Sequence, residues 1–564
     1  MKATSTFLRN TLFIFLLLGA MPVCAANYYW VGGTGHWSDY NGHWATQSGG
    51  QVYYNHAPTP QDTVIFDSLS FIGNNDTVYA SSNTQYCHTM KWLMPDSMPV
   101  LYGTDPKTKL KIYGSMLLDT AMTWNFAGQL IFFGTDSGNA ITTCGKPLGF
   151  ILFSGDTLAS WTLQDTLRCA HLIFRSGNFY SRGNTILTGT YEQDDINHSR
   201  QFLDTSMIYC SQFRNNHNPL QFDADSSTFI VTGNWLDGGG LTFGAVILPG
   251  ITFVTGNNTI EHLTCYGNSR LSGSNTIGTL TGGEPGIVLS LYAGTTQTIT
   301  DSIEFNGACT GMSAFICTTI NATASIDFMN TAATLDRVFL ENVNATGNGA
   351  TANNSVLINS GGWSITNVAV QRNLYWVDGT GAWSDTSHWS LNPGGTGGEC
   401  APTPIDNVRF DALSFINPSE YVVGDLDVEF CHDMDWTGAA NSPAYSQDTG
   451  MIMCYGYFLI PQPITAFDAN MTMRSAQVNT PVATASATLK SITFDGDGGW
   501  SMQSTLQASG IYFVNGDFKS SGYNITAAGT VFPMESPGNM DFSGSVVSSP
   551  DWSFNGASGN FFAP

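Results

Sequence analysis

The sequence predicts an all-β protein made of β-solenoid units in tandem, each opened by a tryptophan-rich cap. Two observations lead to this prediction: a Trp-rich segment occurs twice, and short strand-like motifs return at short, regular intervals. Composition agrees, because charged residues make up only 11% and Gly supplies 60 of the 564 positions. Such a chain favours many short strands joined by turns over helices.

The overall charge and length restrict the possible partners. A chain of 564 residues is too long for one ordinary compact domain unless the fold is elongated. The formal net charge of −24 argues against nucleic acid or an anionic membrane surface as a partner. A soluble secreted surface that resists association is the better interpretation.

The start of the chain, positions 1–26, has the pattern of a signal peptide. Lys2 and Arg9 give a positive start, Leu12 to Met21 form an apolar core, and Val23-Cys24-Ala25-Ala26 is a small-residue cleavage region. No later stretch is long and apolar enough to span a membrane. The predicted location is therefore secreted, extracellular or on the outer cell surface.

The Trp-rich segment divides the remaining chain into two units. The first copy runs from Tyr29 to Asp39 and reaches His43-Trp44, and the second runs from Tyr375 to Asp385 and reaches His388-Trp389. The motifs that follow also correspond, as in Pro58-Thr59-Pro60 and Pro402-Thr403-Pro404. The predicted domains are residues 27–373 and a truncated second unit, residues 374–564, lying end to end.

Within the first unit a shorter period predicts the coils. The motif Asn258-Thr259-Ile260 recurs shortly afterwards as Asn275-Thr276-Ile277. Fixed-length reuse of the same side chains is typical of a solenoid and not of a β-sandwich, in which strands and turns also alternate. We therefore expect Ile260 to stack on Ile277 inside the coil, and the asparagines to form a hydrogen-bonded ladder.

The recurrent tryptophans have two interpretations. A solenoid exposes an open apolar bore at each end, and a Gly-rich loop bearing indoles can seal it. Exposed indoles also stack on sugar rings, so a carbohydrate-binding role is the alternative. Sealing explains why the motif opens each unit and is preferred. The carbohydrate-binding candidates are Trp30, Trp37, Trp44, Trp376, Trp383 and Trp389.

The cysteines suggest disulfides, because the chain carries an export signal. Cys400 and Cys431 flank the strand region of the second unit and are predicted to form a bridge. The first unit has His56 where Cys400 would be, so it cannot form the same bridge. Cys309 and Cys317 are close enough in sequence to close a loop. Without a Cys-x-x-Cys pair, a zinc site is not predicted.

The opening motif resembles a known class of proteins. The pattern Tyr-Trp-Val-x-Gly-x-Gly-x-Trp-Ser-Asp with His-Trp, followed by Pro-Thr-x-x-Asp-x-Val-x-Phe-Asp, resembles the repeat units of large secreted surface proteins of Bacteroidetes type. The resemblance implies right-handed parallel β-helix units, adhesive or matrix roles, and a sorting domain of the type IX secretion pathway. No such domain is found in this sequence, and we expect the chain to be a fragment of a longer protein with further units.

Catalytic and metal-binding patterns are weak. The run Glu192 to Arg200 combines carboxylates, an imidazole and a guanidinium, but a hydrophilic run of this kind usually forms a solvated loop. Asp223-Ala224-Asp225 and Asp495-Gly496-Asp497 hint at calcium, yet the Glu that a calcium loop needs at its twelfth position is absent. No catalytic residue, metal or cofactor is predicted.

The functional prediction is a secreted or cell-surface structural or adhesive repeat protein without catalytic activity. Extracellular glycans or matrix are its expected partners, together with other units of a longer chain. A carbohydrate-binding surface protein is the alternative, and a polysaccharide lyase or hydrolase on a β-helix is a further one.

Overall fold

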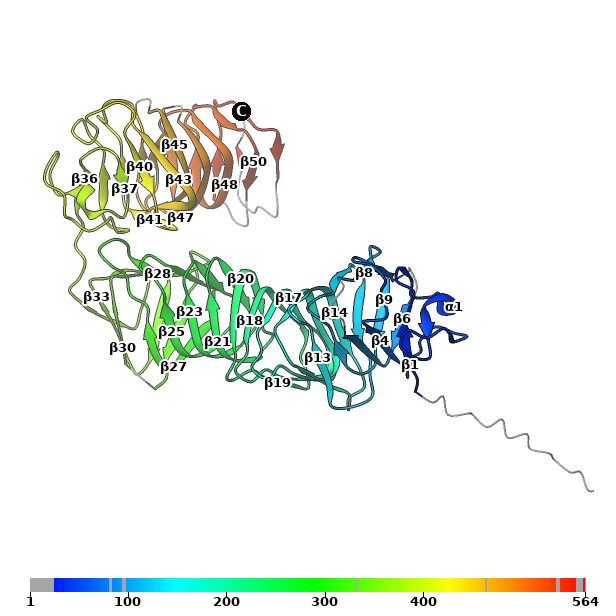
Figure 1. The fold of residues 1–564 in the computed structure, drawn as a ribbon. Helices are drawn as coiled ribbons and strands as arrows, with labels where there is room; N and C mark the ends of the chain where they lie inside the picture. Colours follow the sequence, from blue (N-terminus) through cyan, green and yellow to red (C-terminus); the bar gives the residue numbers. More distant parts are fainter. Residues whose placement is uncertain are drawn as a thin grey trace, which may run out of the picture.

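The computed structural model describes residues 25–80, 84–93, 98–330, 332–461, 464–485, 487–533, 538–553 and 561–562. Most of the predicted signal peptide lies outside these residues. The chain is a parallel β-solenoid of about 22 turns. Among the described strands all pairs are parallel, except β1 with β3 and β36 with β38. Figure 1 shows the coils stacked into two rods.

The first unit contains the following elements: β1 (Asn27–Trp30), β2 (Gly35–His36), α1 (Tyr40–His43), β3 (Trp44–Ala45), β4 (Thr63–Asp67), β5 (Thr77–Tyr79), β6 (Thr84–Cys87), β7 (Thr89–Leu93), β8 (Val100–Gly103), β9 (Lys109–Ile112), β10 (Met116–Leu117), β11 (Thr123–Phe126), β12 (Gln129–Phe132), β13 (Asn139–Thr142), β14 (Pro147–Ser154), β15 (Ser160–Leu163), β16 (Leu167–Tyr180), β17 (Ile186–Phe202), β18 (Met207–His217), β19 (Gln221–Asp223), β20 (Thr228–Asp237), β21 (Thr242–Leu248), β22 (Thr252–Thr255), β23 (Thr259–Cys265), β24 (Ser269–Leu271), β25 (Thr276–Gly282), β26 (Val288–Leu291), β27 (Thr296–Glu304), β28 (Ser313–Cys317), β29 (Ala324–Phe328), β30 (Ala333–Asp336), β31 (Val338–Glu341), β32 (Val343–Gly347), β33 (Ala350–Asn353), β34 (Val356–Ile358) and β35 (Trp363–Thr366).

The second unit contains β36 (Asn373–Trp376), β37 (Gly381–Ala382), the 3₁₀ helix η1 (Thr386–His388), β38 (Trp389–Ser390), β39 (Asn407–Arg409), β40 (Tyr421–Gly424), β41 (Val428–Cys431), β42 (Met434–Asp435), β43 (Ala444–Cys454), β44 (Phe458–Leu459), β45 (Ala466–Met473), β46 (Thr480–Ala483), β47 (Thr488–Met502), β48 (Leu506–Lys519), β49 (Ile525–Ala527), β50 (Thr530–Pro533), β51 (Met540–Asp541), β52 (Val547–Ser548), β53 (Asp551–Trp552) and β54 (Phe561–Phe562).

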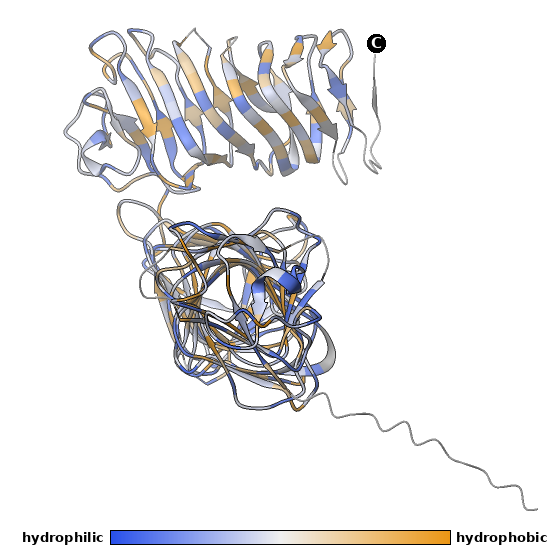
Figure 2. Ribbon diagram, turned by 45° about the vertical axis from the view of Figure 1, so that its right-hand side comes forward, coloured by the Kyte–Doolittle hydropathy of each residue, from blue (hydrophilic) through white to orange (hydrophobic). Residues whose placement is uncertain are grey.

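Side chains alternate between the bore and the solvent along most strands. In β45, Phe467, Ala469, Met471 and Met473 are buried, while the residues between them are at least partly exposed. Such alternation follows from the two-residue period of a strand. Figure 2 shows it as changing hydropathy along the strands of the second unit. Described residues include no helix with the length and apolar character needed to cross a membrane.

The predicted stacking of like residues is confirmed. Ile260 of β23 lies opposite Ile277 of β25, and both are fully buried. The polar ladder is also present, because the Asn258 backbone N–H donates to the Asn275 side-chain oxygen at 2.9 Å. Asn275 in turn donates its amide to Gln297 at 2.9 Å. The ladder keeps buried turn amides paired from coil to coil.

The two units have separate apolar cores but do not lie end to end. One continuous cluster extends from Tyr28 to Trp363, and another from Leu374 to Phe542. Figures 1 and 2 together show the second rod folded back beside the end of the first, with the rod axes crossed. The prediction that the two units lie end to end is therefore wrong.

An apolar patch on the outside of each rod explains this arrangement. A third cluster combines side chains of β26, β28, β31 and β34 with Val428, Phe430 and Tyr455 of the second unit. Phe339 packs edge-on against Phe430, with ring centroids 5.4 Å apart. Strands β28, β31 and β41 are buried along their whole length, so both of their faces are covered. Burying these outer faces favours side-by-side packing.

The disulfide prediction is also wrong. Cys400 bonds to Cys309 and not to Cys431, so the bridge joins the two units across a sequence separation of 91. Cys317 is a free, buried thiol, and Cys309 therefore closes no loop with it. Cys431 lies in β41 opposite Cys454 of β43, inside the second bore. Burial raises the pKa of Cys431 and so keeps this thiol protonated and unreactive.

Candidate functional site

The tryptophan segment of the first unit, residues 27–45, forms a compact aromatic cluster. Strand β1 pairs with β3 on one side and with β4 of the next coil on the other. Trp44 makes edge-on contacts with Trp30 and Trp37, with centroids 5.0 and 5.2 Å apart. Phe66 of β4 continues the cluster and stacks on Trp92 at 4.0 Å. The indoles therefore pack onto the first coils.

Residues 373–390 repeat this geometry. Trp389 contacts Trp376 at 5.0 Å and Trp383 at 4.9 Å, again edge-on. In both copies the exposed fraction of every indole is between 0 and 2%: Trp30, Trp37, Trp44, Trp376, Trp383 and Trp389. None of these six side chains presents a face to solvent, so they do not form a surface on which a sugar ring could stack.

The recurrent polar residues of this segment bind backbone groups. His43 Nδ1 lies 2.7 Å from the Val31 carbonyl oxygen, and His388 Nδ1 lies 2.7 Å from that of Val377. Each imidazole also stacks on an indole, His43 on Trp30 at 4.6 Å. Side-chain contacts of this kind fix the Gly-rich loops, in which Gly35 has no room for a side chain because His43 fills the space.

The prediction that the run from Glu192 to Arg200 forms a loop is wrong. These residues are part of the long strand β17. Its pairing with β16 shifts so that Phe174 faces Gln193 while Ser176 faces His198, and the intervening residues bulge. Glu192 accepts from His171 at 2.8 Å, and Asp194 pairs with Arg175 at 2.6 Å. The side chains of residues 195–197 lie outside the described part of the chain.

The two carboxylate pairs considered for calcium have other surroundings. Asp495 accepts from Asn515 at 2.7 Å and lies 3.4 Å from the Arg474 guanidinium. Asp223 ends the short strand β19, and Asp225 is part of the turn that follows. The described residues contain no group of three or more His, Cys, Asp or Glu side chains placed to hold a metal ion.

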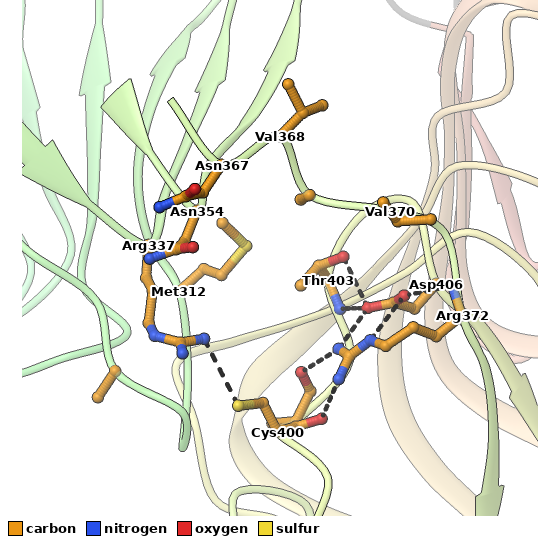
Figure 3. A pocket seen from close by; sticks show the side chains of 13 residues that line it. Met312, Arg337, Asn354, Asn367, Val368, Val370, Arg372, Cys400, Thr403 and Asp406 are labelled. Atoms are coloured by element: carbon orange, nitrogen blue, oxygen red, sulfur yellow. Dashed lines mark hydrogen bonds and ion pairs between the residues drawn. The ribbon is translucent and has the colours of Figure 1, made fainter. Parts of the chain in front are cut away.

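An open cavity of about 510 Å³ lies where the two units meet (Figure 3). Arg372 on its wall pairs with Asp406 at 2.7 Å and also lies 3.5 Å from Glu399. Arg337 reaches the sulfur of Cys400 at 3.5 Å from the first unit. The polar groups of this cavity are thus engaged in holding the chain between the units.

A buried ion pair lies next to this junction. Glu341 of the first unit accepts from Arg474 of the second at 3.1 Å, and their side chains are 3% and 5% exposed. Tyr455 donates its hydroxyl to the same carboxylate oxygen at 3.1 Å. Burial raises the pKa of Glu341, while Arg474 and Tyr455 oppose that shift. The cluster joins the units but opens onto only a small cavity of about 170 Å³.

Sequence reasoning missed one surface feature, an outward ladder on successive coils. Trp235 of β20 lies opposite Phe253 of β22, which lies opposite Arg270 of β24. The Trp235 and Phe253 ring centroids are 6.0 Å apart, and the Arg270 guanidinium lies 5.1 Å from the Phe253 centroid. Trp235 is 40% exposed. The sequence could have indicated this outward indole, because Trp235 directly precedes the apolar Leu236. Neighbouring residues of a strand point to opposite faces, so the inward Leu236 directs the indole outward.

Comparison of the chain with protein-family models, with curated proteins and with solved structures finds no match.

Proposed function

We propose that this chain is an exported structural or adhesive repeat protein of the cell surface or extracellular matrix. Support comes from the role of the polar residues that recur in both units. Most of them hold loops and turns of the coils in place. In one turn the Asp67 N–H donates to the Ser70 hydroxyl, and the Asp67 carboxylate accepts from the backbone N–H two positions later. Asp411 and Ser414 form the same two bonds in the second unit. The polar features that recur in both units therefore stabilise the fold of the coils.

The tryptophan segments, in this proposal, seal the start of each bore. Their indoles are buried at the first coil of each unit, where unpaired strand edges and apolar side chains would otherwise meet water. At the other end of the first unit, Trp363 packs on Phe328 with centroids 5.8 Å apart and donates to the Val343 carbonyl at 2.9 Å. Sealed ends favour discrete rods over open-ended stacking.

Covalent and apolar contacts between the units fit a load-bearing role outside the cell. The disulfide between Cys309 and Cys400 is of a kind that persists in oxidising compartments. Together with the apolar cluster around Phe339 and Phe430, this disulfide holds the two rods in a fixed relative orientation. We expect a rigid two-rod module that repeats in a longer protein.

The test is a binding and degradation screen with the full chain. Purified protein is applied to immobilised extracellular polysaccharides and matrix proteins, and the same polysaccharides are assayed for released reducing or unsaturated sugar. The proposal expects retention on at least one polymer and no sugar release. Release that disappears in a Glu192→Gln/Asp194→Asn variant would instead establish the enzymatic alternative, with the β17 bulge as its site.

A second candidate, carbohydrate binding, is favoured by the ladder of Trp235, Phe253 and Arg270. A half-exposed indole beside a phenyl ring offers stacking surface, and the guanidinium adds hydrogen-bond donors for hydroxyl or carboxylate groups. A Trp235→Ala variant should lose retention on the bound polysaccharide. Tyr421→Ala, which removes an aromatic side chain of similar exposure (41%) from β40 of the second unit, is the matched control and should retain binding.

A further inference from the structure

Each unit begins with a buried carboxylate that holds the incoming chain. Asp62 and Asp406 are 2% and 1% exposed. Each accepts from the backbone N–H of the threonine three positions earlier, at 2.9 Å in both units. Each also accepts from the backbone nitrogen of the residue just before the first strand, which is Ala26 at 3.0 Å or Arg372 at 2.8 Å. The two sites therefore match in backbone geometry.

The sites differ in charge. Arg372 adds its guanidinium to Asp406, with Nε at 3.1 Å and Nη2 at 2.7 Å, so that carboxylate is neutralised. Ala26 has no charged side chain, and Asp62 forms no ion pair with any described residue. A buried carboxylate without a cation is costly.

The titratable neighbours of Asp62 supply no positive charge. They are the phenols of Tyr28 and Tyr54 and the thiol of Cys87, and Asp62 raises the pKa of each after the larger effect of burial. Two histidines lie nearby, but the ring of His56 bonds to the Tyr28 hydroxyl at 3.0 Å and that of His88 to Asp136 at 3.0 Å, and neither is within ion-pair distance of Asp62. A cation at the position of the Ala26 nitrogen would complete the first site as Arg372 completes the second.

We propose that the export leader is cleaved between Ala25 and Ala26, and that the new Ala26 α-ammonium forms the ion pair with Asp62. The inference rests on the proposed export. A signal peptidase would hydrolyse the bond with water. The C–N bond breaks, the water oxygen joins the Ala25 carboxylate, and both water protons pass to the Ala26 nitrogen. That nitrogen already lies 3.0 Å from Asp62.

The contacts of Ala26 select this bond over the next one. Ala26 also accepts from the Thr63 N–H through its carbonyl at 2.9 Å, as Arg372 accepts from Asn407 at 2.8 Å. Cleavage after Ala26, at the boundary expected from sequence, would remove both the carbonyl and the nitrogen. Asp62 would then lose a donor as well as its cation. Ala25 is exposed and makes no comparable contact in the hydrogen bonds described.

The first test identifies the N-terminus of the exported protein. The full chain with its own leader is expressed in an exporting bacterial host, recovered outside the cytoplasm, and examined by intact mass and N-terminal sequencing. We expect Ala26. A start at Asn27 or any other internal residue overturns the inference and leaves the export proposal standing. An intact start at Met1 overturns both.

The second test measures the ion pair itself. Reductive methylation with ¹³C-formaldehyde labels the α-amino group, whose pKa is then followed by NMR. We expect this pKa to lie at least about one unit above the value of the urea-unfolded chain, which is roughly tenfold tighter proton binding. Asp62→Asn should abolish the difference, whereas the matched change Asp406→Asn in the second unit should leave it. An α-amino pKa that Asp62→Asn does not move overturns the ion pair.

Discussion

At the scale of single residues, Glu429 is the most unusual acidic side chain of the second unit. It is fully buried in β41 and points into the bore, while its neighbours Val428 and Phe430 face the first unit. Its carboxyl oxygens accept from the Leu426 N–H at 3.1 Å and from the Gln447 side chain. Burial, with a smaller contribution from Asp425, raises the pKa of Glu429 well above its ordinary value.

A raised carboxyl pKa makes stability fall as pH rises. The unfolded chain releases this proton at about pH 4.3, whereas the folded chain retains it. The free energy of unfolding therefore falls by about 1.4 kcal/mol for each pH unit above that point, until the folded group ionises. Glu429→Gln should remove this pH-dependent loss of stability. We therefore expect the stability of the variant relative to the wild type to be higher at pH 8 than at pH 5. Thermal unfolding midpoints at both pH values measure the difference.

Glu420→Gln is the matched control. Hydrogen bonds from Asn417 and Ile416 outweigh slight burial and lower the pKa of Glu420. A lowered pKa contributes stability above the unfolded value that is lost only in more acidic solution. Between pH 5 and pH 8 the effect of this substitution should therefore be constant. A Glu429→Gln effect that is equally constant would show that Glu429 is ionised in the folded protein.

At the scale of elements, the tryptophan segments should govern the stability of the first coils. Trp37→Ala removes a side chain that is 2% exposed and leaves a cavity beneath the Gly-rich loop. We expect a loss of about 3–5 kcal/mol. Hydrogen exchange should accelerate first in β1 and β4, because each coil of a solenoid is stabilised by its neighbours. Strands β16 to β18 should keep their protection.

Trp235→Ala is the control for the loss of an indole as such. Its side chain is 40% exposed and stands on the outer face, so the change in stability should stay within about 0.5 kcal/mol. If both substitutions cost the same, the indoles of the first segment do not seal the coil stack. Acrylamide quenching gives a parallel measurement, since Trp235 should be quenched strongly and the buried indoles weakly.

The coil repeat could be predicted because the matching motifs of successive coils lie close together in the sequence. Matching Asn-Thr-Ile motifs in successive coils fix which side chains stack, as Ile260 and Ile277 show. The outer contact had a weaker signal. Ser313–Cys317 and Val338–Glu341 are mostly apolar runs, typical of strands buried on both faces. Such a run indicates a covered outer face but does not identify the covering surface, which lies far along the chain at β41.

At the scale of the whole molecule, the buried pair of Glu341 and Arg474 links the rods. Removing one partner leaves a charge in the interface without its counterion, and we expect Arg474→Met to cost about 3–5 kcal/mol. The double variant Glu341→Met/Arg474→Met should recover most of that loss, since apolar side chains replace buried ion pairs well. Thermal unfolding of the four proteins completes the cycle. Additive losses would mean that the two residues do not interact.

The disulfide could not be predicted from spacing, because sequence distance does not report which surfaces meet. Cys400 and Cys431 belong to one unit and flank its strand region, but the strand register places Cys431 inside the bore. Cys400 belongs to the segment that crosses to the first unit, where the Ala401 N–H donates to the Cys309 carbonyl at 2.9 Å. Peptide mapping without reduction should recover the fragment that joins Cys309 to Cys400.

The apolar cluster between the units should keep the rods together even when this disulfide is removed. Cys400→Ser should leave the maximum dimension in small-angle X-ray scattering unchanged, because the apolar cluster around Phe430 still joins the units. Adding Phe430→Asp places a charge in that cluster and should let the rods swing apart, which increases the maximum dimension. Tyr421→Asp, at a residue that is 41% exposed, is the matched control and should have no such effect. If Cys400→Ser alone opens the molecule, the disulfide and not the apolar surface determines its shape.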